Sequence, residues 1–277
     1  MNIAAFQTFL AVVETGNLSK AAEQLNVTQS TVTTRLDVLE ETLGQKLLVR
    51  SRRGAELTKA GFAFQRHAEL MVQAWDQARK TVGLPRGFSG LFSFGCHYDL
   101  WEGAGALWLD QIRRNHPDLA LETWAGDLDE LTRWLGSGLV DAALSAEPIM
   151  GADLIARELM KDRLVQVSTE RRPVQEWHPD YVYVDLGPEF RRQHTLAWPG
   201  DETAHMTFSS SRWALDYLLE QGGSAYLPQR LSEPHVRAAR LFPVVGSPEF
   251  TRPLFLVWRK ESAAIYPWVA EQDILNQ

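Results

Sequence analysis

The 277-residue sequence has one cysteine, no long apolar run and no proline before Pro85. The single thiol, Cys96, cannot form an internal disulfide or supply a multi-thiolate zinc site, which excludes structural zinc of that kind. No stretch approaches the about 18 apolar residues of a membrane span, and the first residues lack the basic segment of a secretory signal. We therefore expect a cytoplasmic globular protein with no membrane partner.

The motifs of common enzyme classes are also missing. We find no G-x-S-x-G, G-x-x-x-x-G-K or H-E-x-x-H, and Gly103-Ala104-Gly105 lacks the third glycine of a dinucleotide loop. Cys96 and His97 are adjacent, but neighbouring side chains on a strand point to opposite faces. The acidic residues within 127–130 fit a solvated helix start better than a metal loop. We expect neither an enzyme nor a bound metal or cofactor.

Charge is distributed unevenly along the chain. Residues 1–86 carry 11 Lys and Arg against 8 Asp and Glu, a balance of +3, whereas the other 191 residues carry 17 against 27, a balance of −10. Nine of the ten tryptophans also follow residue 86. This asymmetry predicts a slightly basic module and a strongly acidic one with different tasks, separated at residues 84–90.

Apolar residues in the basic module recur with the spacing of short amphipathic helices. The pattern predicts helices over residues 2–15 and 20–25, and a third that begins after Thr28 and ends at Gly44, with Ser19 and Thr28 as N-caps. Residues 46–57 have the pattern of a two-stranded hairpin with a basic tip. Together these elements predict an all-α winged helix-turn-helix domain over residues 1–58.

Residues 58–82 contain no proline and one glycine, Gly61, and predict a single long helix that starts a linker segment over residues 59–87. Its apolar positions alternate in steps of four and three, as in the seam of a coiled coil. The alternative is a helix that covers the core of its own domain. The seam interpretation makes this a dimerisation helix through Phe64, Ala68, Met71, Trp75, Ala78 and Val82.

The acidic half alternates strands and helices, which predicts one or two doubly wound α/β domains. Strands are expected near residues 91–94, 119–123, 141–145, 164–168, 181–185, 205–208, 225–227 and 254–258, and helices near 100–116, 127–136 and 211–221.

Specific sequence stretches resemble the LysR-type transcriptional regulators. They are FLAVVE at 9–14, LSKAAEQL at 18–25, TQSTVT at 28–33, LEETLG at 39–44 and LTKAG at 57–61, with weaker likeness in LVDAAL at 139–144 and QGGSAYLP at 221–228. The likeness is close over residues 3–62, and the family's layout fits the rest of the chain. The chain departs from the family at Ser30, where proline is usual, at Thr33, where serine is usual, and at Leu48, where phenylalanine is common.

The resemblance implies a two-lobed, periplasmic-binding-protein-like effector domain over residues 88–277. Lobe one would comprise residues 88–161 and 243–277, and lobe two residues 162–242, with two crossover strands between them and a small-molecule effector in the cleft. The resemblance also implies a homodimer that associates further into a dimer of dimers, and RNA polymerase as a partner. A symmetric dimer would bind double-stranded DNA at an interrupted inverted repeat.

A recognition helix that starts after Thr28 would place polar side chains in the major groove, where Gln can pair with adenine and Arg with guanine or phosphate. Wing arginines would contact the DNA backbone or the minor groove, unless they form only a solvated basic turn. The predicted DNA-binding residues are Ser19, Thr28, Gln29, Ser30, Thr31, Thr33, Thr34, Arg35, Arg50, Arg52 and Arg53.

In open α/β sheets, ligands collect at strand carboxyl ends near helix N-termini. The predicted effector-binding residues are Cys96, His97, Tyr98, Asp99, Trp101, Glu147, Ser209, Ser210 and Ser211. Asp99 complicates the site, because an acid there repels an anion, and it serves equally well as an N-cap. The aromatic and acidic side chains in this predicted site, Tyr98, Trp101 and Glu147, favour a ligand with an aromatic or apolar body and at least one donor group.

The sequence thus favours a DNA-binding regulator that responds to an effector. A regulator without a diffusible effector stays open. A solute-binding protein would need a secretory signal, and an enzyme with an appended DNA-binding domain would need a catalytic motif.

Overall fold

A computed structural model describes residues 2–51, 54–174, 178–200 and 204–271. The chain divides into two compact units, residues 1–86 and 87–277. The division falls inside the segment 84–90, where composition changes along the sequence. Among the described residues, no helix combines the length and the apolar character needed to cross a bilayer.

The first unit begins with three helices: α1 (Ile3–Thr15), α2 (Leu18–Gln24) and α3 (Gln29–Leu43). Thr28 caps α3 by accepting the Thr31 amide at 3.2 Å, and Gly44 ends the helix in the left-handed region at φ 64°, as predicted. The predicted cap of α2 is wrong. Asn17 caps that helix by accepting the amides of Ser19 and Lys20, so Ser19 lies in the first turn.

Strands β1 (Leu48–Ser51) and β2 (Gly54–Leu57) pair antiparallel and form the wing. The wing packs tightly against the end of α1, because the Ala55 amide donates to the Gly16 carbonyl at 2.8 Å. A Cβ at Gly54 would lie 2.4 Å from that carbonyl oxygen, so the close approach requires glycine.

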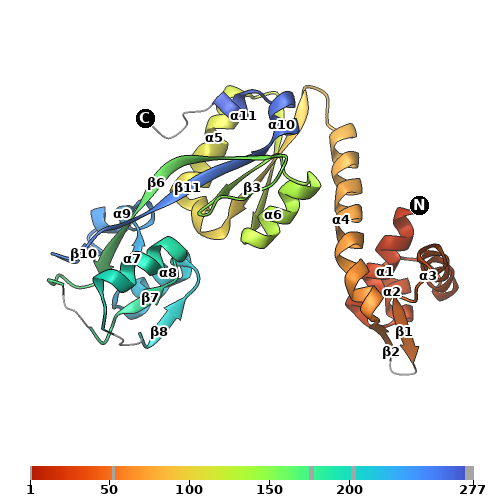
Figure 1. Ribbon diagram of the computed structural model, residues 1–277, viewed down its shortest axis with the longest axis horizontal. Coiled ribbons are helices and arrows are strands. Elements are labelled where there is room, and N and C mark those ends of the chain that lie inside the picture. Colours follow the sequence, from red (N-terminus) through yellow and green to blue (C-terminus); the bar gives the residue numbers. More distant parts are fainter. Residues whose placement is uncertain (1, 52–53, 175–177, 201–203, 272–277) are drawn as a thin grey trace. The chain divides into compact units, whose positions relative to one another are not determined.

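Helix α4 (Lys59–Val82) is the long helix that the sequence predicts, and Thr58 caps it by accepting the Gly61 amide at 2.9 Å. Its first half packs on its own unit (Figure 1). The Phe64 ring lies 5.8 Å from Phe6 and 5.4 Å from Phe9, centroid to centroid.

The predicted dimer seam is therefore only partly free. Ala68 is fully buried inside the unit, so its assignment to a dimer interface is wrong. Phe64 and Met71 also pack against this core, as the alternative interpretation of the helix expects. Trp75, Ala78 and Val82, in the second half of the helix, are exposed.

The second unit contains a seven-stranded sheet with the order β10-β6-β11-β5-β3-β4, and β9 pairs with β6. Its first lobe is built on the parallel strands β3 (Gly90–His97), β4 (Leu119–Gly126) and β5 (Ala142–Ser145). Helices α5 (Ala106–Asn115) and α11 (Trp268–Glu271) share one core with these strands. Helices α6 (Leu128–Ser137) and α10 (Lys260–Ile265) complete the lobe.

The second lobe has its own core around Phe190, Leu215 and Tyr226. It consists of β7 (Val182–Val184), α7 (Pro188–Ala197), β8 (Met206–Phe208), α8 (Ser211–Gln221), β9 (Ser224–Pro228), α9 (Gln229–Arg237) and β10 (Phe242–Pro243). His194 packs among its aromatic rings, and burial lowers the pKa of the imidazole to about 4.

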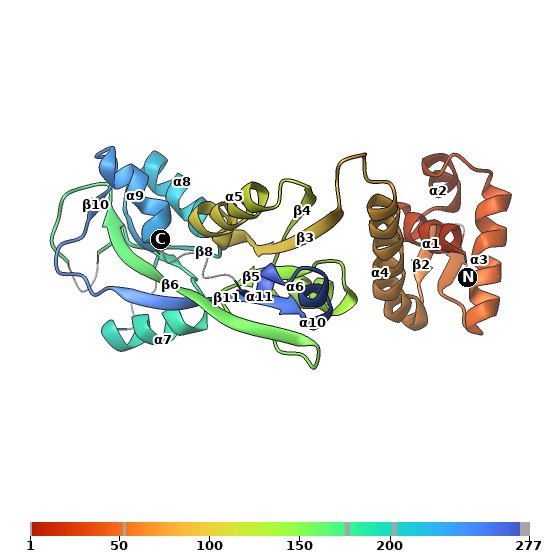
Figure 2. The same cartoon turned by 90° about the horizontal axis from the view of Figure 1, so that it is seen from above.

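Two long antiparallel strands, β6 (Leu154–Ser168) and β11 (Phe250–Arg259), run side by side from one lobe to the other (Figures 1 and 2). Phe250 belongs to the lobe-two core and Leu254 to the lobe-one core. The chain therefore returns to lobe one between these residues. The sequence-based boundary at residue 243 is too early, because β10 pairs with β6 on the lobe-two side.

The segment after β3 differs from its prediction. The helix expected over residues 100–116 starts at Ala106, after a 3-10 turn (Tyr98–Leu100) and an irregular turn (Trp101–Gly105). Gly103 has φ 78°, and a Cβ there would lie 3.1 Å from Cβ of Arg230. The irregular turn thus brings the backbone of lobe one against an arginine of lobe two.

Candidate DNA-binding face and interlobe cleft

The start of α3 and the adjacent turn of α2 present a polar surface. Ser19, Thr28, Gln29, Ser30 and Thr34 are exposed on it. The Ser19 hydroxyl donates to the Gln29 side-chain carbonyl at 3.1 Å, which holds the amide of Gln29 at the helix start. An exposed amide in this position can form paired hydrogen bonds with an adenine edge.

The other predicted DNA-contact residues are less accessible or are not described. Thr31 and Thr33 are half-buried. Arg35 is half-buried and donates to the Thr8 hydroxyl of α1 at 3.3 Å, so its guanidinium is partly engaged within the unit. Arg52 and Arg53, and the side chain of Arg50, lie outside the described residues.

The second unit has a cavity of about 220 Å³ between its lobes. Lobe one contributes His97, Asp99, Leu128, Ser145, Ala146 and Glu147, and Asp185, Leu186, Gly187, Pro188, Arg191, Ser209 and Arg252 complete the lining. Four predicted effector residues, His97, Asp99, Glu147 and Ser209, therefore meet in one place.

The remaining predicted effector residues do not line this cavity. Cys96 belongs to the lobe-one core, and burial raises the pKa of its thiol to about 12. Tyr98 points to solvent and donates its hydroxyl to Glu130 at 3.0 Å. Trp101 is 39% exposed and packs over Gly105.

The serine run after β8 divides its roles. Ser209 lines the cavity, whereas Ser210 is the N-cap of α8 and accepts the Trp213 amide at 3.4 Å. Ser211 is buried, and its amide donates to the carboxylate of Asp99 at 2.9 Å. Asp99 thus does cap a helix, but the helix belongs to the opposite lobe.

Three carboxylates line the cavity, those of Asp99, Glu147 and Asp185, and both arginines of its described lining are already paired with a carboxylate. Arg191 is paired with Asp185 at 2.8 Å, and Arg252 with Asp162 at 3.1 Å. Burial lowers the pKa of the His97 imidazole, because a charged ring there would lose its hydration. The neutral His97 presents a polar ring to this cavity rather than a positive charge.

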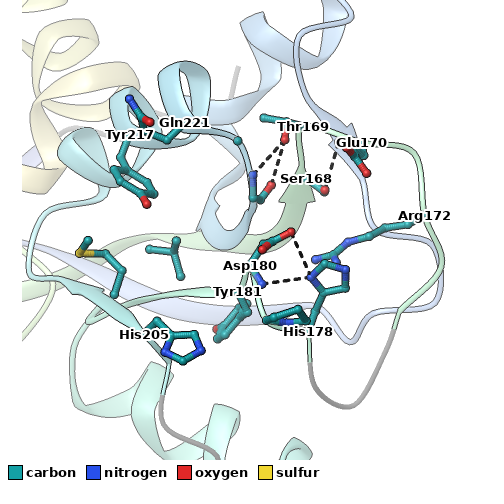
Figure 3. A pocket seen from close by; sticks show the side chains of 15 residues that line it. Ser168, Thr169, Glu170, Arg172, His178, Asp180, Tyr181, His205, Tyr217 and Gln221 are labelled. Atoms are coloured by element: carbon teal, nitrogen blue, oxygen red, sulfur yellow. Dashed lines mark hydrogen bonds and ion pairs between the residues drawn. The ribbon is translucent and has the colours of Figure 1, made fainter.

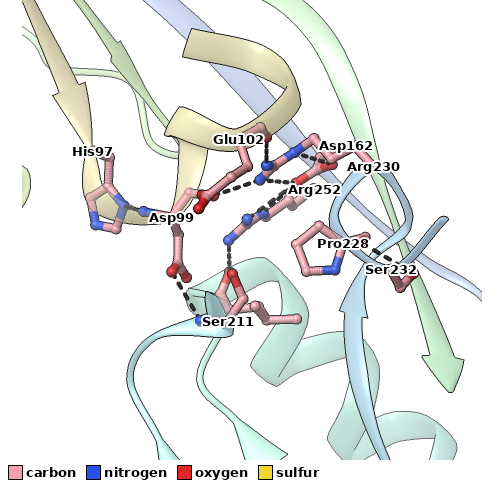
Figure 4. Close-up of polar contacts among 10 residues, drawn as sticks. His97, Asp99, Glu102, Asp162, Ser211, Pro228, Arg230, Ser232 and Arg252 are labelled. Atoms are coloured by element: carbon pink, nitrogen blue, oxygen red, sulfur yellow. Dashed lines mark hydrogen bonds and ion pairs between the residues drawn. The ribbon is translucent and has the colours of Figure 1, made fainter. Parts of the chain in front are cut away.

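A buried ionic network borders the cavity where the crossover strands pass (Figure 4). Asp162 on β6 is 2% exposed and accepts hydrogen bonds from Arg252 on β11 and Arg230 on α9. Sequence reasoning missed these three residues, because single charged residues within or beside strand patterns give no local signal of a partner 68 or 90 residues away.

Lobe two contains a second cavity of about 290 Å³, next to the turn between α8 and β9 (Figure 3). Its lining includes Arg172, His178 and Tyr181, and the Thr169 hydroxyl accepts the Gly223 amide at its edge. None of the predicted effector residues lines it. Four of the nine predicted effector residues line the cavity between the lobes instead.

Residues 3–62 match the family described as "Bacterial regulatory helix-turn-helix protein, lysR family". Residues 85–268 match the LysR substrate binding domain. The chain belongs to the LysR family. Its two units are accordingly the DNA-binding and the effector-binding domains of a LysR-type transcriptional regulator, and the resemblance seen in the sequence is confirmed.

Relatives of the chain agree with this assignment. The HTH-type transcriptional regulator HdfR of Shigella boydii is 29% identical over 266 residues, which cover 95% of this chain and 93% of HdfR. The crystal structure of CbnR, a LysR family transcriptional regulator, matches with a TM-score of 0.79. The two sequences are 19% identical, and the match covers 100% of both chains. CbnR in complex with its target DNA is 20% identical, covers 99% of both chains and has a TM-score of 0.75. These structures share the fold.

Proposed function

We propose that this LysR-type regulator binds an interrupted inverted repeat in double-stranded DNA through α3 and the wing. The exposed start of α3, where Ser19 holds Gln29, carries the proposal. The wing arginines Arg50, Arg52 and Arg53 would add salt-dependent contacts to the DNA backbone. We also propose that the protein acts in the cytoplasm, by binding alone and without catalysis.

Titrations of operator DNA test the DNA-binding residues. Gln29→Ala should relax the preference at one base pair by about 1–3 kcal/mol, because one paired contact is lost. Arg52→Ala should weaken operator and scrambled DNA alike and reduce the salt slope by about 1. Gln45→Ala, an exposed position just after α3, is the control. Unchanged affinity and base preference in both variants would contradict the docking.

We further propose that a small molecule binds between the lobes and changes the affinity for DNA. Support comes from the cavity, in which His97, Glu147 and Ser209 present hydrogen-bonding groups from both sides. A bound effector should raise the melting temperature by an amount set by its concentration relative to its dissociation constant. It should also shift operator affinity. A compound that stabilises the protein without changing operator affinity would not be an effector of DNA binding.

The assembly is proposed as a homodimer through the second half of α4, extended to a dimer of dimers that contacts RNA polymerase. The support is the exposed stripe of Trp75, Ala78 and Val82 on a helix whose first half is already packed. Two copies of the unit at residues 1–86 would then face two half-sites of the operator.

A further inference from the structure

A carboxylate of lobe one occupies the N-terminus of a helix in lobe two. Asp99 follows β3, and its side chain accepts the Ser211 amide at 2.9 Å in the first turn of α8 (Figure 4). Both residues are buried: Asp99 is 4% exposed and Ser211 1%. The free amides and the dipole of a helix N-terminus attract negative charge, so the contact is favourable where it is shielded from water.

In a second set of hydrogen bonds across the cleft, a side chain of lobe two reaches the backbone of lobe one. Arg230, at the start of α9 in lobe two, donates to the backbone carbonyls of Asp99 and Glu102 in lobe one. The Arg230 side chain lies directly over Gly103, where no Cβ intervenes. We call the Asp99–Ser211 bond and these two carbonyl contacts the interlobe latch.

Among the described residues, the arginines around the latch are already paired with carboxylates. Of the described residues that line the cavity, the two arginines are each paired with a carboxylate, Arg191 with Asp185 and Arg252 with Asp162. His97 is held towards its neutral form by burial. Glu147 adds a further acid to the lining. Among the described lining residues, an incoming carboxylate would meet no unpaired cation, and it would have to displace Asp99 to reach the α8 amide.

We propose that Asp99 is an intramolecular ligand of the cleft, which joins the two lobes and reserves the cavity for neutral or cationic effectors by occupying the position that an anion would take. This inference rests on the proposed role of the cavity as the effector site. Removing the carboxylate should both loosen the latch and open the α8 N-terminus to an external anion.

Hydrogen exchange of the full-length protein measures the latch. In Asp99→Ser, the amide of Ser211 should exchange about tenfold faster or more, since a hydrogen bond to a charged group is lost. Asp99→Asn keeps an acceptor oxygen, so its Ser211 amide should be protected to an intermediate degree. This variant replaces Asp99→Ser in the comparison with the wild type if the serine variant is unstable. Asp129→Ser removes a carboxylate from the exposed first turn of α6 and should leave the Ser211 amide unchanged.

Thermal shift with benzoate, at constant ionic strength, measures the exclusion of anions. Benzoate should raise the melting temperature of Asp99→Ser saturably and leave the wild type and Asp129→Ser unaffected. Equal stabilisation of the wild type, or unchanged exchange at Ser211 in a folded Asp99→Ser variant, would overturn the inference.

Operator binding separates this inference from the proposed function. A benzoate response in Asp99→Ser without a change in operator affinity would support the intramolecular ligand and contradict the coupling of the cleft to DNA. If Asp99→Ser showed neither faster exchange at the Ser211 amide nor stabilisation by benzoate, while operator binding stayed intact, the result would contradict only the proposed role of Asp99 as an intramolecular ligand.

Discussion

Glu40 joins the recognition helix to the wing through a single buried carboxylate. It is 3% exposed, and one of its oxygens accepts the amides of Leu47 and Leu48 at 2.9 and 3.2 Å. The other oxygen accepts from Lys46 at 2.7 Å. Burial alone would raise the pKa of Glu40, but these hydrogen bonds outweigh it and hold the pKa below its usual value. The side chain therefore fixes where the wing leaves α3.

We expect Glu40→Gln to destabilise the first unit by about 1–3 kcal/mol, because an amide cannot replace every charge-assisted bond. The lowered pKa makes this contribution present above the pKa of an unfolded glutamate, and the contribution is lost as the pH falls through the folded value. Urea unfolding at neutral and acid pH measures it. The exposed neighbour Glu41→Gln should change little, and equal stability of the two variants at pH 7 would contradict the role of Glu40.

Sequence reasoning found individual site residues where the signal was local. The caps Thr28 and Gly44 follow from residue type and position alone. The contact of Asp99 with the other lobe could not be predicted in this way, because its partner Ser211 is 112 residues away. Arg230, Arg252 and Asp162 escaped for the same reason, since only the folded chain shows that three separate segments supply one ionic network.

Helix α4 is divided along its length between two kinds of packing. Its first half completes the core of its own unit, whereas Trp75 is 49% exposed and Val82 89%. The apolar repeat is continuous along the helix, so the sequence predicts a single seam. In the structure the first half of this seam packs inside the unit and the second half is exposed. The exposed half is the part available to a second copy.

We expect Trp75→Glu to shift the protein from dimer to monomer, because the variant buries an unpaired charge in the proposed interface. Operator affinity should fall with it, since the two half-sites would no longer be bound together. Light scattering and DNA titration measure both effects. Gln73→Glu adds the same charge two residues away, on the far side of the helix, and should keep the dimer. A Trp75→Glu protein that remains dimeric would place the interface elsewhere.

At the level of elements, periodicity predicted most strands but not their full lengths. Only residues 164–168 of β6 were recognised, because its first part carries Arg157, Glu158 and Lys161 in place of an apolar alternation. Helix α9 was missed since Pro234 interrupts its pattern. The helix expected from residue 100 begins at Ala106, because Gly103 takes a positive φ in the preceding turn.

On the scale of the whole effector-binding unit, Asp162 holds two arginines where the crossover strands pass between the lobes. Asp162→Asn leaves Arg230 and Arg252 without a buried counter-charge and should destabilise the unit by about 3–5 kcal/mol. Chemical denaturation measures the loss. Glu249→Gln, which breaks the exposed pair between Arg163 of β6 and the residue just before β11, should cost under about 1 kcal/mol. Similar losses in both variants would contradict a special role for the buried network.

The position of β11 in the sheet also determines the order in which a newly made chain can fold. Strand β11 lies between β5 and β6, yet the ribosome makes it after the rest of lobe two. At about 5–20 residues per second, the roughly 100 residues between β5 and β11 take roughly 5–20 s to synthesise. Lobe two, whose buried core residues all lie between Leu164 and Phe250 in the sequence, is complete before lobe one. During that interval the β5 edge of lobe one lacks its neighbour β11, and an unpaired strand edge can pair with another chain.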